Sequence, residues 1–245
     1  MKARDSKPPM EDSKALMTRT NTCLDPSTNE SFDKEIHFFA TNDNIEHHNK
    51  HCLRSLNYPI AVSVATKVKG NCMQIDEDEM KLELIIAVGA RVMLTSNIWT
   101  NVGLVNGALG FVEKNVYKPG KSPPEPPTYV LVRFDNYMGV PWDDSSPQTV
   151  PITPIKRGSR KQLPLKLAWG LTIHKSQGLT LEKATINIGK KERQGMMFTA
   201  ISRVKDMNGI RFQTPFSYDR YAKMEKVAGV TARKAEEERL RSITL

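Results

Sequence analysis

The sequence contains no apolar run long enough to cross a membrane. The nearest candidate, residues 82–94, falls short of the roughly 18 apolar residues that a spanning helix needs, and Arg91 interrupts it. The chain begins with the polar sequence Met-Lys-Ala-Arg-Asp, which is unlike a secretory signal peptide. Both absences argue against a membrane-inserted or secreted protein.

Cysteine is scarce. Cys23, Cys52 and Cys72 are odd in number and widely spaced, and no Cys-x-x-Cys pair occurs. This pattern fits a reducing, intracellular compartment better than a disulfide framework or a zinc site. The histidines of residues 47–51 lack an accompanying carboxylate or cysteine pattern, so we predict no metal site.

A phosphate-binding P-loop is also missing. That loop needs Gly, four residues, then Gly-Lys-Ser or Gly-Lys-Thr at the start of a helix. Residues 120–122 read Gly-Lys-Ser, but Asn115 stands where the first glycine is required, and prolines fill the position of the helix. Residues 75–77, Ile-Asp-Glu, faintly resemble a magnesium-binding acidic box but read better as a solvated loop. We therefore expect no ATPase activity from this chain alone.

Positive charge is concentrated in one segment. The whole chain has a net charge of +9, whereas residues 154–205 hold twelve basic and two acidic residues, a net charge of +10. The remaining sequence, with 24 basic and 25 acidic residues, has a net charge of −1. Such concentration favours a polyphosphate partner; a solvated basic face is the alternative.

Strand and helix patterns alternate near both ends of the chain. With 39% hydrophobic residues, the sequence can form a packed core. The alternation predicts an α/β fold with a parallel sheet and flanking helices. The predicted strands are residues 36–40, 60–66, 165–171, 184–188 and 210–213; the predicted helices are residues 43–56 and 194–204; and residues 82–94 are two strands or one bent strand.

The middle of the chain has a different sequence pattern. Short strands with turn signals, at residues 110–117, 129–134 and 149–153, surround a proline-rich loop, which predicts a small inserted β-barrel. The predicted division of the chain is a loose lead-in at residues 1–34, a main domain at residues 35–107 and 164–229, the inserted barrel at residues 108–163 and a charged helical tail at residues 230–245.

The most informative stretch is residues 172–181, Thr-Ile-His-Lys-Ser-Gln-Gly-Leu-Thr-Leu, which follows a predicted strand. Hydroxyl, Lys and turn amide groups bind phosphate oxygens, and ligands of open α/β sheets lie at the carboxyl ends of strands. In residues 200–204, Ala-Ile-Ser-Arg-Val, Arg203 ends an apolar helix. A guanidinium on a rigid element can stabilise the charge of a γ-phosphate.

Together these stretches resemble the petite-integration-frequency (Pif) helicases, superfamily-one relatives of RecD. The resemblance runs in order from about residue 30 to 220 and is nearest to the eukaryotic branch that includes helicase parts of rolling-circle transposons. Residues 172–181 resemble motif V and residues 198–204 motif VI; residues 38–42 with Asn49 resemble the segment after motif IV; residues 89–94, Asn97 and residues 103–107 resemble the lead into an SH3-like insertion; and residues 212–220 match the closing segment.

The resemblance implies a fold and a set of roles. The fold would be a RecA-like second motor domain (2A) with an inserted SH3-like barrel (2B), and the activity a 5′-to-3′ DNA helicase driven by ATP with Mg²⁺. The magnesium ligands would lie in a P-loop half supplied in cis or in trans. Arg203 would contact the ATP γ-phosphate; Gln177 and Gly178 would join the ATP cleft to the DNA track; and Thr41, Asn42, Thr172, His174, Lys175 and Ser176 would bind single-stranded DNA.

Several alternatives stay open. The alternatives to a helicase half are a non-catalytic nucleic-acid-binding protein, a transposon remnant, and a protein-interaction module built on the barrel. The alternative role of Arg203 is that of a surface ion-pair partner, and the alternative role of Thr41 and Asn42 is to cap a helix. Tyr137 and Trp142 are candidates for stacking on bases. The expected location is the nucleus, with the mitochondrion as the alternative.

Overall fold

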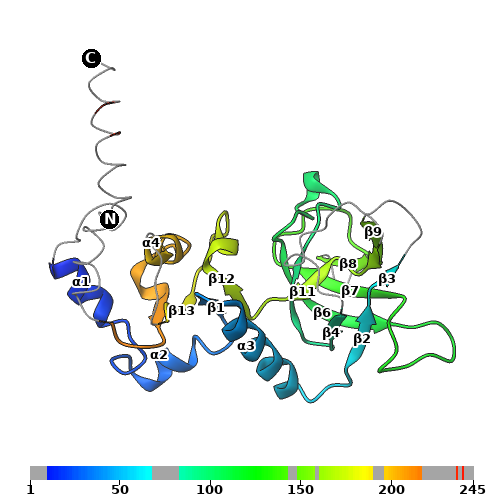
Figure 1. Ribbon diagram of the computed structural model, residues 1–245, viewed down its shortest axis with the longest axis horizontal. Helices are drawn as coiled ribbons and strands as arrows, with labels where there is room; N and C mark the ends of the chain where they lie inside the picture. The colour runs from blue at the N-terminus through cyan, green and yellow to red at the C-terminus, as the bar shows by residue number, and fades with distance from the viewer. Residues whose placement is uncertain are drawn as a thin grey trace. The chain divides into compact units, whose positions relative to one another are not determined.

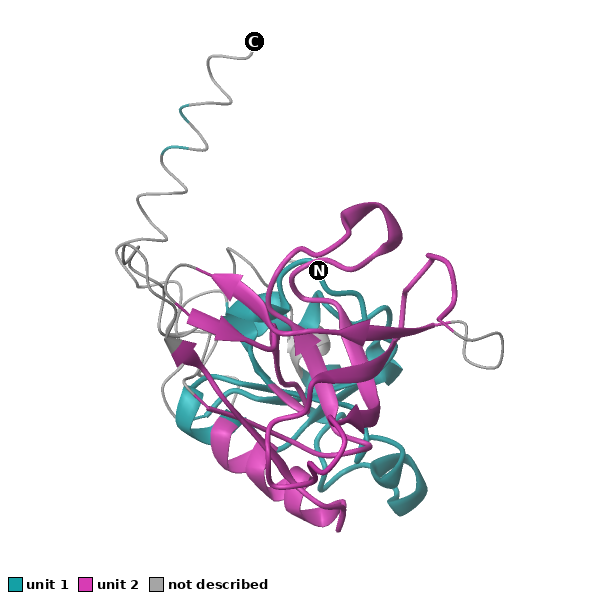
Figure 2. Cartoon of the chain, turned by 90° about the vertical axis from the view of Figure 1, so that its right-hand side faces the viewer, with its two compact units in different colours: residues 1–45, 171–245 teal, residues 46–170 magenta. Residues whose placement is uncertain are grey.

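The computed structural model describes residues 10–67, 83–142, 148–157, 160–189 and 196–216, together with residues 236 and 239. The chain divides into two compact units (Figures 1 and 2). Unit 1 comprises residues Met1–Ile45 and Leu171–Leu245, and unit 2 comprises Glu46–Gly170. Among the described residues, no helix is both long and apolar enough to cross a membrane.

Unit 1 is built on a four-stranded sheet in the order β12-β1-β13-β14. β1 pairs in parallel with β13, and β13 pairs in parallel with β14. All four residues of β1 are buried, as expected for a strand covered on both faces. The elements of unit 1 are α1 (Met10–Met17), α2 (Pro26–Glu30), β1 (Ile36–Phe39), β12 (Gly170–Thr172), the 3-10 helix η2 (Ile173–Ser176), β13 (Ala184–Asn187), α4 (Met196–Ile201), the 3-10 helix η3 (Met207–Gly209) and β14 (Ile210–Phe212).

Unit 2 is dominated by a five-stranded antiparallel sheet in the order β11-β5-β6-β7-β8. In β7, Val130, Val132 and Phe134 are buried and alternate with more exposed residues, which is the pattern of a strand with one face on the core. The elements of unit 2 are α3 (Asn42–Ser55, which belongs to this unit from Glu46 onward), β2 (Ala61–Val64), β3 (Thr66–Lys67), β4 (Glu83–Ile86), β5 (Arg91–Leu94), the 3-10 helix η1 (Thr100–Val102), β6 (Leu109–Val116), β7 (Tyr129–Phe134), β8 (Thr149–Ile152), β9 (Ile155–Arg157), β10 (Arg160–Gln162) and β11 (Leu165–Leu167).

The lead-in is not loose, contrary to the sequence prediction. Residues 10–34 contain α1 and α2, and both Leu16 and Phe32 are fully buried. Arg19 donates through Nε to the Ile210 carbonyl at 3.1 Å. Arg211, also on β14, donates to the Asn29 carbonyl at 2.7 Å. These contacts join segments about 180 residues apart, so local sequence periodicity could not reveal them.

The domain boundary also differs from the prediction at residue 108. Residues 91–94 form β5, which pairs with β6 and β11 and therefore belongs to unit 2. Residues 82–94 do contain two strands, β4 and β5, with Gly89 between them at φ +82°. The charged tail lies outside the described residues except for Glu236 and Arg239, and so does the acidic loop at residues 75–77.

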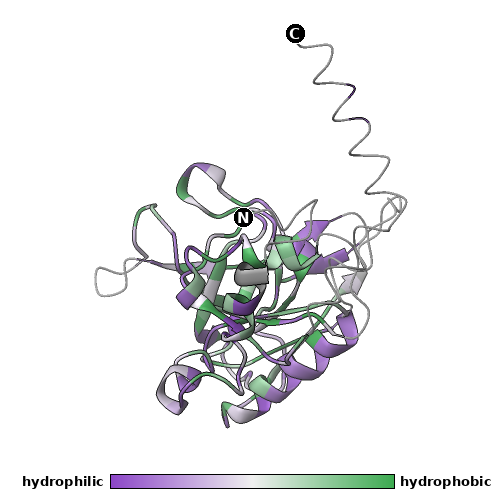
Figure 3. Cartoon of the chain, turned by 90° about the vertical axis from the view of Figure 1, so that its left-hand side faces the viewer, coloured by the Kyte–Doolittle hydropathy of each residue, from purple (hydrophilic) through white to green (hydrophobic). Residues whose placement is uncertain are grey.

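One predicted strand is broken in two. Residues 165–171 were expected to be continuous, but β11 ends at Leu167 and pairs in unit 2, whereas β12 starts at Gly170 and joins the sheet of unit 1. Asn49 is buried on the mostly hydrophilic helix α3 (Figure 3) and binds the backbone at Gly170, where β12 begins. Its Oδ1 accepts from the Gly170 N–H at 2.7 Å, and its Nδ2 donates to the Gly170 carbonyl at 3.2 Å.

Replacing Asn49 with Ala should destabilise the fold. The Asn49→Ala variant leaves a buried N–H and a buried carbonyl of Gly170 without their partner, which should lower the free energy of unfolding by about 1–3 kcal/mol. Urea unfolding monitored by circular dichroism measures this. Asn44→Ala, an exposed position on the same helix, is the matched control, and an equal loss in both variants would contradict the assigned role of Asn49.

Candidate functional site

The 3-10 helix η2 presents two basic side chains to solvent. Thr172 caps it, because its Oγ1 accepts from the Lys175 backbone N–H at 3.3 Å. Ile173 is buried beneath the turn, while His174 and Lys175 are exposed. The cap and the buried Ile173 fix the backbone of this turn in unit 1, so the two basic side chains leave it from a rigid element.

Ser176 does not face solvent, which corrects the prediction that it contacts DNA. Its side chain is fully buried, and its Oγ donates to the Ile173 carbonyl at 2.6 Å. That hydroxyl closes the 3-10 turn on itself and has no exposed surface with which to bind a phosphate.

Gln177 and Gly178 form an exposed tight turn directly after η2. The Leu179 N–H donates to the Ser176 carbonyl at 3.0 Å. Gln177 has φ −59° and ψ 128°, and Gly178 has φ +87°, which together are the angles of a type II turn. The second central position of that turn requires a left-handed backbone, which explains the glycine. Apart from Gly178 itself and its two chain neighbours, no atom lies within 4 Å of where a side chain at this position would begin, so the backbone there is open to a ligand.

Arg203 follows α4, and backbone hydrogen bonds join it to Leu181, the last residue of the stretch 172–181. The Leu181 N–H donates to the Arg203 carbonyl at 2.8 Å, and the Lys205 N–H donates to the Leu181 carbonyl at 3.1 Å. The two segments that the sequence singled out, about 25 residues apart, are therefore one hydrogen-bonded structure. η2 also contacts α4 and β1 within unit 1.

The Arg203 guanidinium is partly exposed and is oriented by its own helix. Its Nε donates to the Thr199 carbonyl at 3.2 Å, and its Nη2 donates to Ser202 Oγ at 3.0 Å. Among the described residues, no carboxylate pairs with it. The charge of this side chain is thus not used in a surface ion pair with the described part of the chain, and donors remain for an external anion.

Thr41 and Asn42 are exposed and stand where β1 gives way to α3. The helix was predicted to begin at residue 43 and begins at Asn42. Both side chains are accessible to a ligand in unit 1. Their predicted contact with DNA stays a prediction.

The two aromatic candidates for base stacking differ from each other. Tyr137 is buried and its hydroxyl donates to the Val140 carbonyl at 2.9 Å, so its ring is not a free stacking surface. Trp142 is 59% exposed. The sequence placed both in loops correctly, but burial of Tyr137 depends on the fold.

The histidines of α3 do not form a metal centre with other described side chains. Burial lowers the pKa of His48, and the nearby His51 and His47 imidazoles lower that pKa further. In residues 10–67 and the later described segments, no group of three or more metal-binding side chains is close enough to hold an ion.

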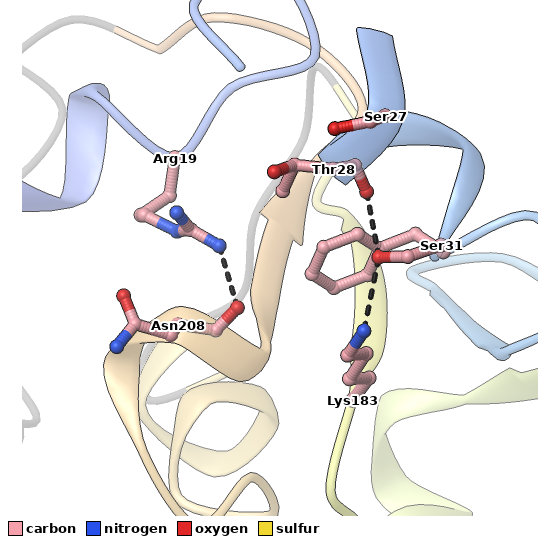
Figure 4. A pocket seen from close by; sticks show the side chains of 7 residues that line it. Arg19, Ser27, Thr28, Ser31, Lys183 and Asn208 are labelled. Atoms are coloured by element: carbon pink, nitrogen blue, oxygen red, sulfur yellow. Dashed lines mark hydrogen bonds between the residues drawn. The ribbon is translucent and has the colours of Figure 1, made fainter. Parts of the chain in front are cut away.

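A polar hollow of about 460 Å³ lies elsewhere in unit 1 and was not predicted (Figure 4). Both of its cationic side chains have a partner inside the protein: Arg19 donates to the Asn208 carbonyl at 2.5 Å, and Lys183 donates to Ser31 Oγ at 3.0 Å. Residues of the lead-in, the residue before β13 and a residue of η3 meet here only in the folded chain. The lining residues are Arg19, Ser27, Thr28, Ser31, Phe32, Lys183 and Asn208.

No protein-family model matches the chain. It is 39% identical over 129 residues to the ATP-dependent DNA helicase PIF1 of Homo sapiens, covering 52% of this chain and 19% of that protein. The chain therefore spans about a fifth of the length of the curated vertebrate relatives it matches. This similarity confirms the resemblance to Pif helicases that the motifs indicated.

Solved helicase structures share the fold. The crystal structure of the Pif1 helicase from Candida albicans superimposes with a TM-score of 0.68 at 22% identity, covering 93% of this chain and 54% of that one. The Bacteroides Pif1 bound to single-stranded DNA gives a TM-score of 0.56 at 24% identity, covering 94% and 55%. The chain thus has the RecA-like α/β fold of these helicases.

Removing the Ser176 hydroxyl should affect stability and not ligand binding. Ser176→Ala deletes a buried hydrogen bond, so we expect the free energy of unfolding to fall by about 0.5–1.5 kcal/mol. Ser55→Ala is the control, because Ser55 makes a similar bond to the His51 carbonyl in an exposed position. Chemical denaturation gives the stability, and weaker oligonucleotide binding at full folding would contradict the buried role.

Proposed function

We propose that this chain is the second motor half of an ATP-dependent 5′-to-3′ DNA helicase. In this proposal unit 1 binds single-stranded DNA and supplies Arg203 to an ATP site whose P-loop has no counterpart in this sequence. The observation that carries the proposal is the pair of hydrogen bonds between Leu181 and the backbone of residues 203–205. They join the turn that would bind DNA to the arginine that would bind ATP.

The DNA-binding role rests on the exposed groups around η2. His174 and Lys175 project from a capped turn, and Gly178 leaves open backbone beside them. Cationic side chains and free backbone amides bind phosphate oxygens without reading the bases. The proposed contact set also includes Thr172, which is partly exposed, and the exposed residues Thr41 and Asn42. Ser176 is left out because its side chain is buried. A related helicase whose structure was solved with single-stranded DNA supports this partner.

The nucleotide-binding role rests on Arg203. A planar guanidinium is suited to bind two phosphate oxygens at once, and its orientation by Thr199 and Ser202 reduces the entropy lost on binding. Gln177 and Gly178 would lie between this arginine and the DNA contacts. ATP with Mg²⁺ is the proposed nucleotide, with the magnesium ligands and P-loop supplied by the other motor half, in cis or in trans.

Unit 2 is proposed to contain the inserted SH3-like barrel. The support is its five-stranded antiparallel sheet, which interrupts the RecA-like unit between β1 and β12. In this proposal β5 belongs with the barrel, so the insertion begins earlier than residue 108.

Charge reversal at Lys175 should weaken binding to single-stranded DNA of any sequence. Lys175→Glu removes a phosphate contact, so the slope of log affinity against log salt should become shallower by about one. Fluorescence anisotropy with labelled oligo-dT between about 50 and 200 mM salt measures it. Lys118→Glu, an exposed residue of unit 2, is the matched control. Absence of any binding at low salt would remove the DNA-binding role.

Loss of Arg203 should abolish ATP hydrolysis in the assembled helicase. With both motor halves present, Arg203→Ala should slow turnover by about 10³-fold or more, because the γ-phosphate charge loses its partner. DNA binding measured without nucleotide should hardly change. Lys205→Ala, a nearby exposed cation paired with Glu182, is the control. A rate for Arg203→Ala within a few-fold of the native enzyme would refute the role.

A further inference from the structure

An exposed threonine followed by proline lies between two sheets of unit 2. Thr153 and Pro154 connect β8, which ends at Ile152, to β9, which begins at Ile155. The Thr153 side chain is exposed. Within the described part of the chain, its hydroxyl makes no hydrogen bond. This hydroxyl is therefore free to react with a second protein.

The chain on either side of Thr153 is extended and has one open edge. β8 is the last strand of the five-stranded sheet, and β9 is the last strand of the sheet β3-β10-β9. β8 pairs with β7 and β9 pairs with β10, and among the described residues no strand pairs with the other edge of either. Proline also restricts the residue before it to an extended backbone. The connector therefore has the conformation in which many peptides bind to a groove on a partner.

A basic side chain follows at a fixed distance from the threonine. The sequence of residues 153–156 is Thr-Pro-Ile-Lys. Lys156 is exposed, and no carboxylate of the described residues pairs with it. A proline directly after the acceptor hydroxyl offers no backbone N–H, and a cation three residues after it can pair with acidic groups of an enzyme. Proline-directed serine/threonine kinases select substrates by these two features.

The other two hydroxyl–proline pairs in the described residues lack this combination. The Ser122 carbonyl accepts from the Glu125 N–H at 3.0 Å, so the backbone there is folded into a tight turn. The third residue after Ser122 is Glu125, an acid. Thr214 is exposed, but the third residue after it carries no charge. Both positions therefore serve as internal controls for Thr153.

We infer that Thr153 is a phosphorylation site for a proline-directed serine/threonine kinase that prefers a basic residue three positions on. Thr153 Oγ1 forms a bond to the γ-phosphorus of ATP held by the kinase with Mg²⁺. The bond from that phosphorus to the β–γ bridging oxygen breaks, ADP leaves, and the hydroxyl proton passes to the kinase. The product adds about −1.5 to −2 charge units at pH 7, so another enzyme sets the charge of this connector. The inference is independent of the proposed helicase function.

Labelling of the folded full chain tests the site. A purified cyclin-dependent kinase with ATP and Mg²⁺ should add phosphate at Thr153, as read by mass spectrometry of the intact chain and its peptides. Thr153→Val keeps the shape of the side chain without its hydroxyl and should reduce labelling to that of a kinase-free control. Lys156→Ala should slow labelling by about two- to fivefold, the effect of one exposed ion pair. Ser122→Ala and Thr214→Val should be labelled at the native rate.

Four results would overturn the inference. They are no label in the native chain, label at Ser122 or Thr214 in place of Thr153, an unchanged rate for Lys156→Ala, and label at Thr153 only after the chain is unfolded in urea. Circular dichroism checks that Thr153→Val is folded. If it is not, Thr153→Ser replaces it, and phosphoserine at position 153 is then the expected product. Loss of DNA binding in Lys175→Glu tests the proposed function alone and leaves this result unaffected.

Discussion

The backbone pairing between Leu181 and residues 203–205 is the constraint on which the candidate site depends. It joins the segment that follows the η2 turn to the segment that follows α4 inside unit 1. Gly209 tightens the same region, because a side chain there would meet the Glu182 carbonyl at 2.0 Å.

The second constraint is the passage of the chain between the two units. Asn49 binds both polar backbone groups of Gly170 and thereby ends the pairing of β11 before β12 begins. Leaving those groups unpaired in the interior would be costly. One buried amide thus fixes where the chain leaves unit 2 and starts the strand that leads into η2.

Charge is used in two distinct ways in this protein. On the five-stranded sheet, arginines are paired with carboxylates, and their role there is satisfied within the fold. On η2 and at Arg203, no carboxylate of the described residues pairs with Lys175 or with the Arg203 guanidinium. The positive charge of residues 154–205 is therefore divided between the two units of the chain.

The sequence by itself determined β1 and helix α3 to within one residue, and it singled out the stretches around Lys175 and Arg203 that the fold joins by hydrogen bonds. These follow from periodicity, capping and residue type, which act over a few positions. Only the tertiary structure decided that Ser176 and Tyr137 are turned inward, that residues 10–34 are ordered against β14, and that residues 165–171 divide between two sheets. Burial and partner choice depend on segments far apart in the chain, which no local pattern encodes.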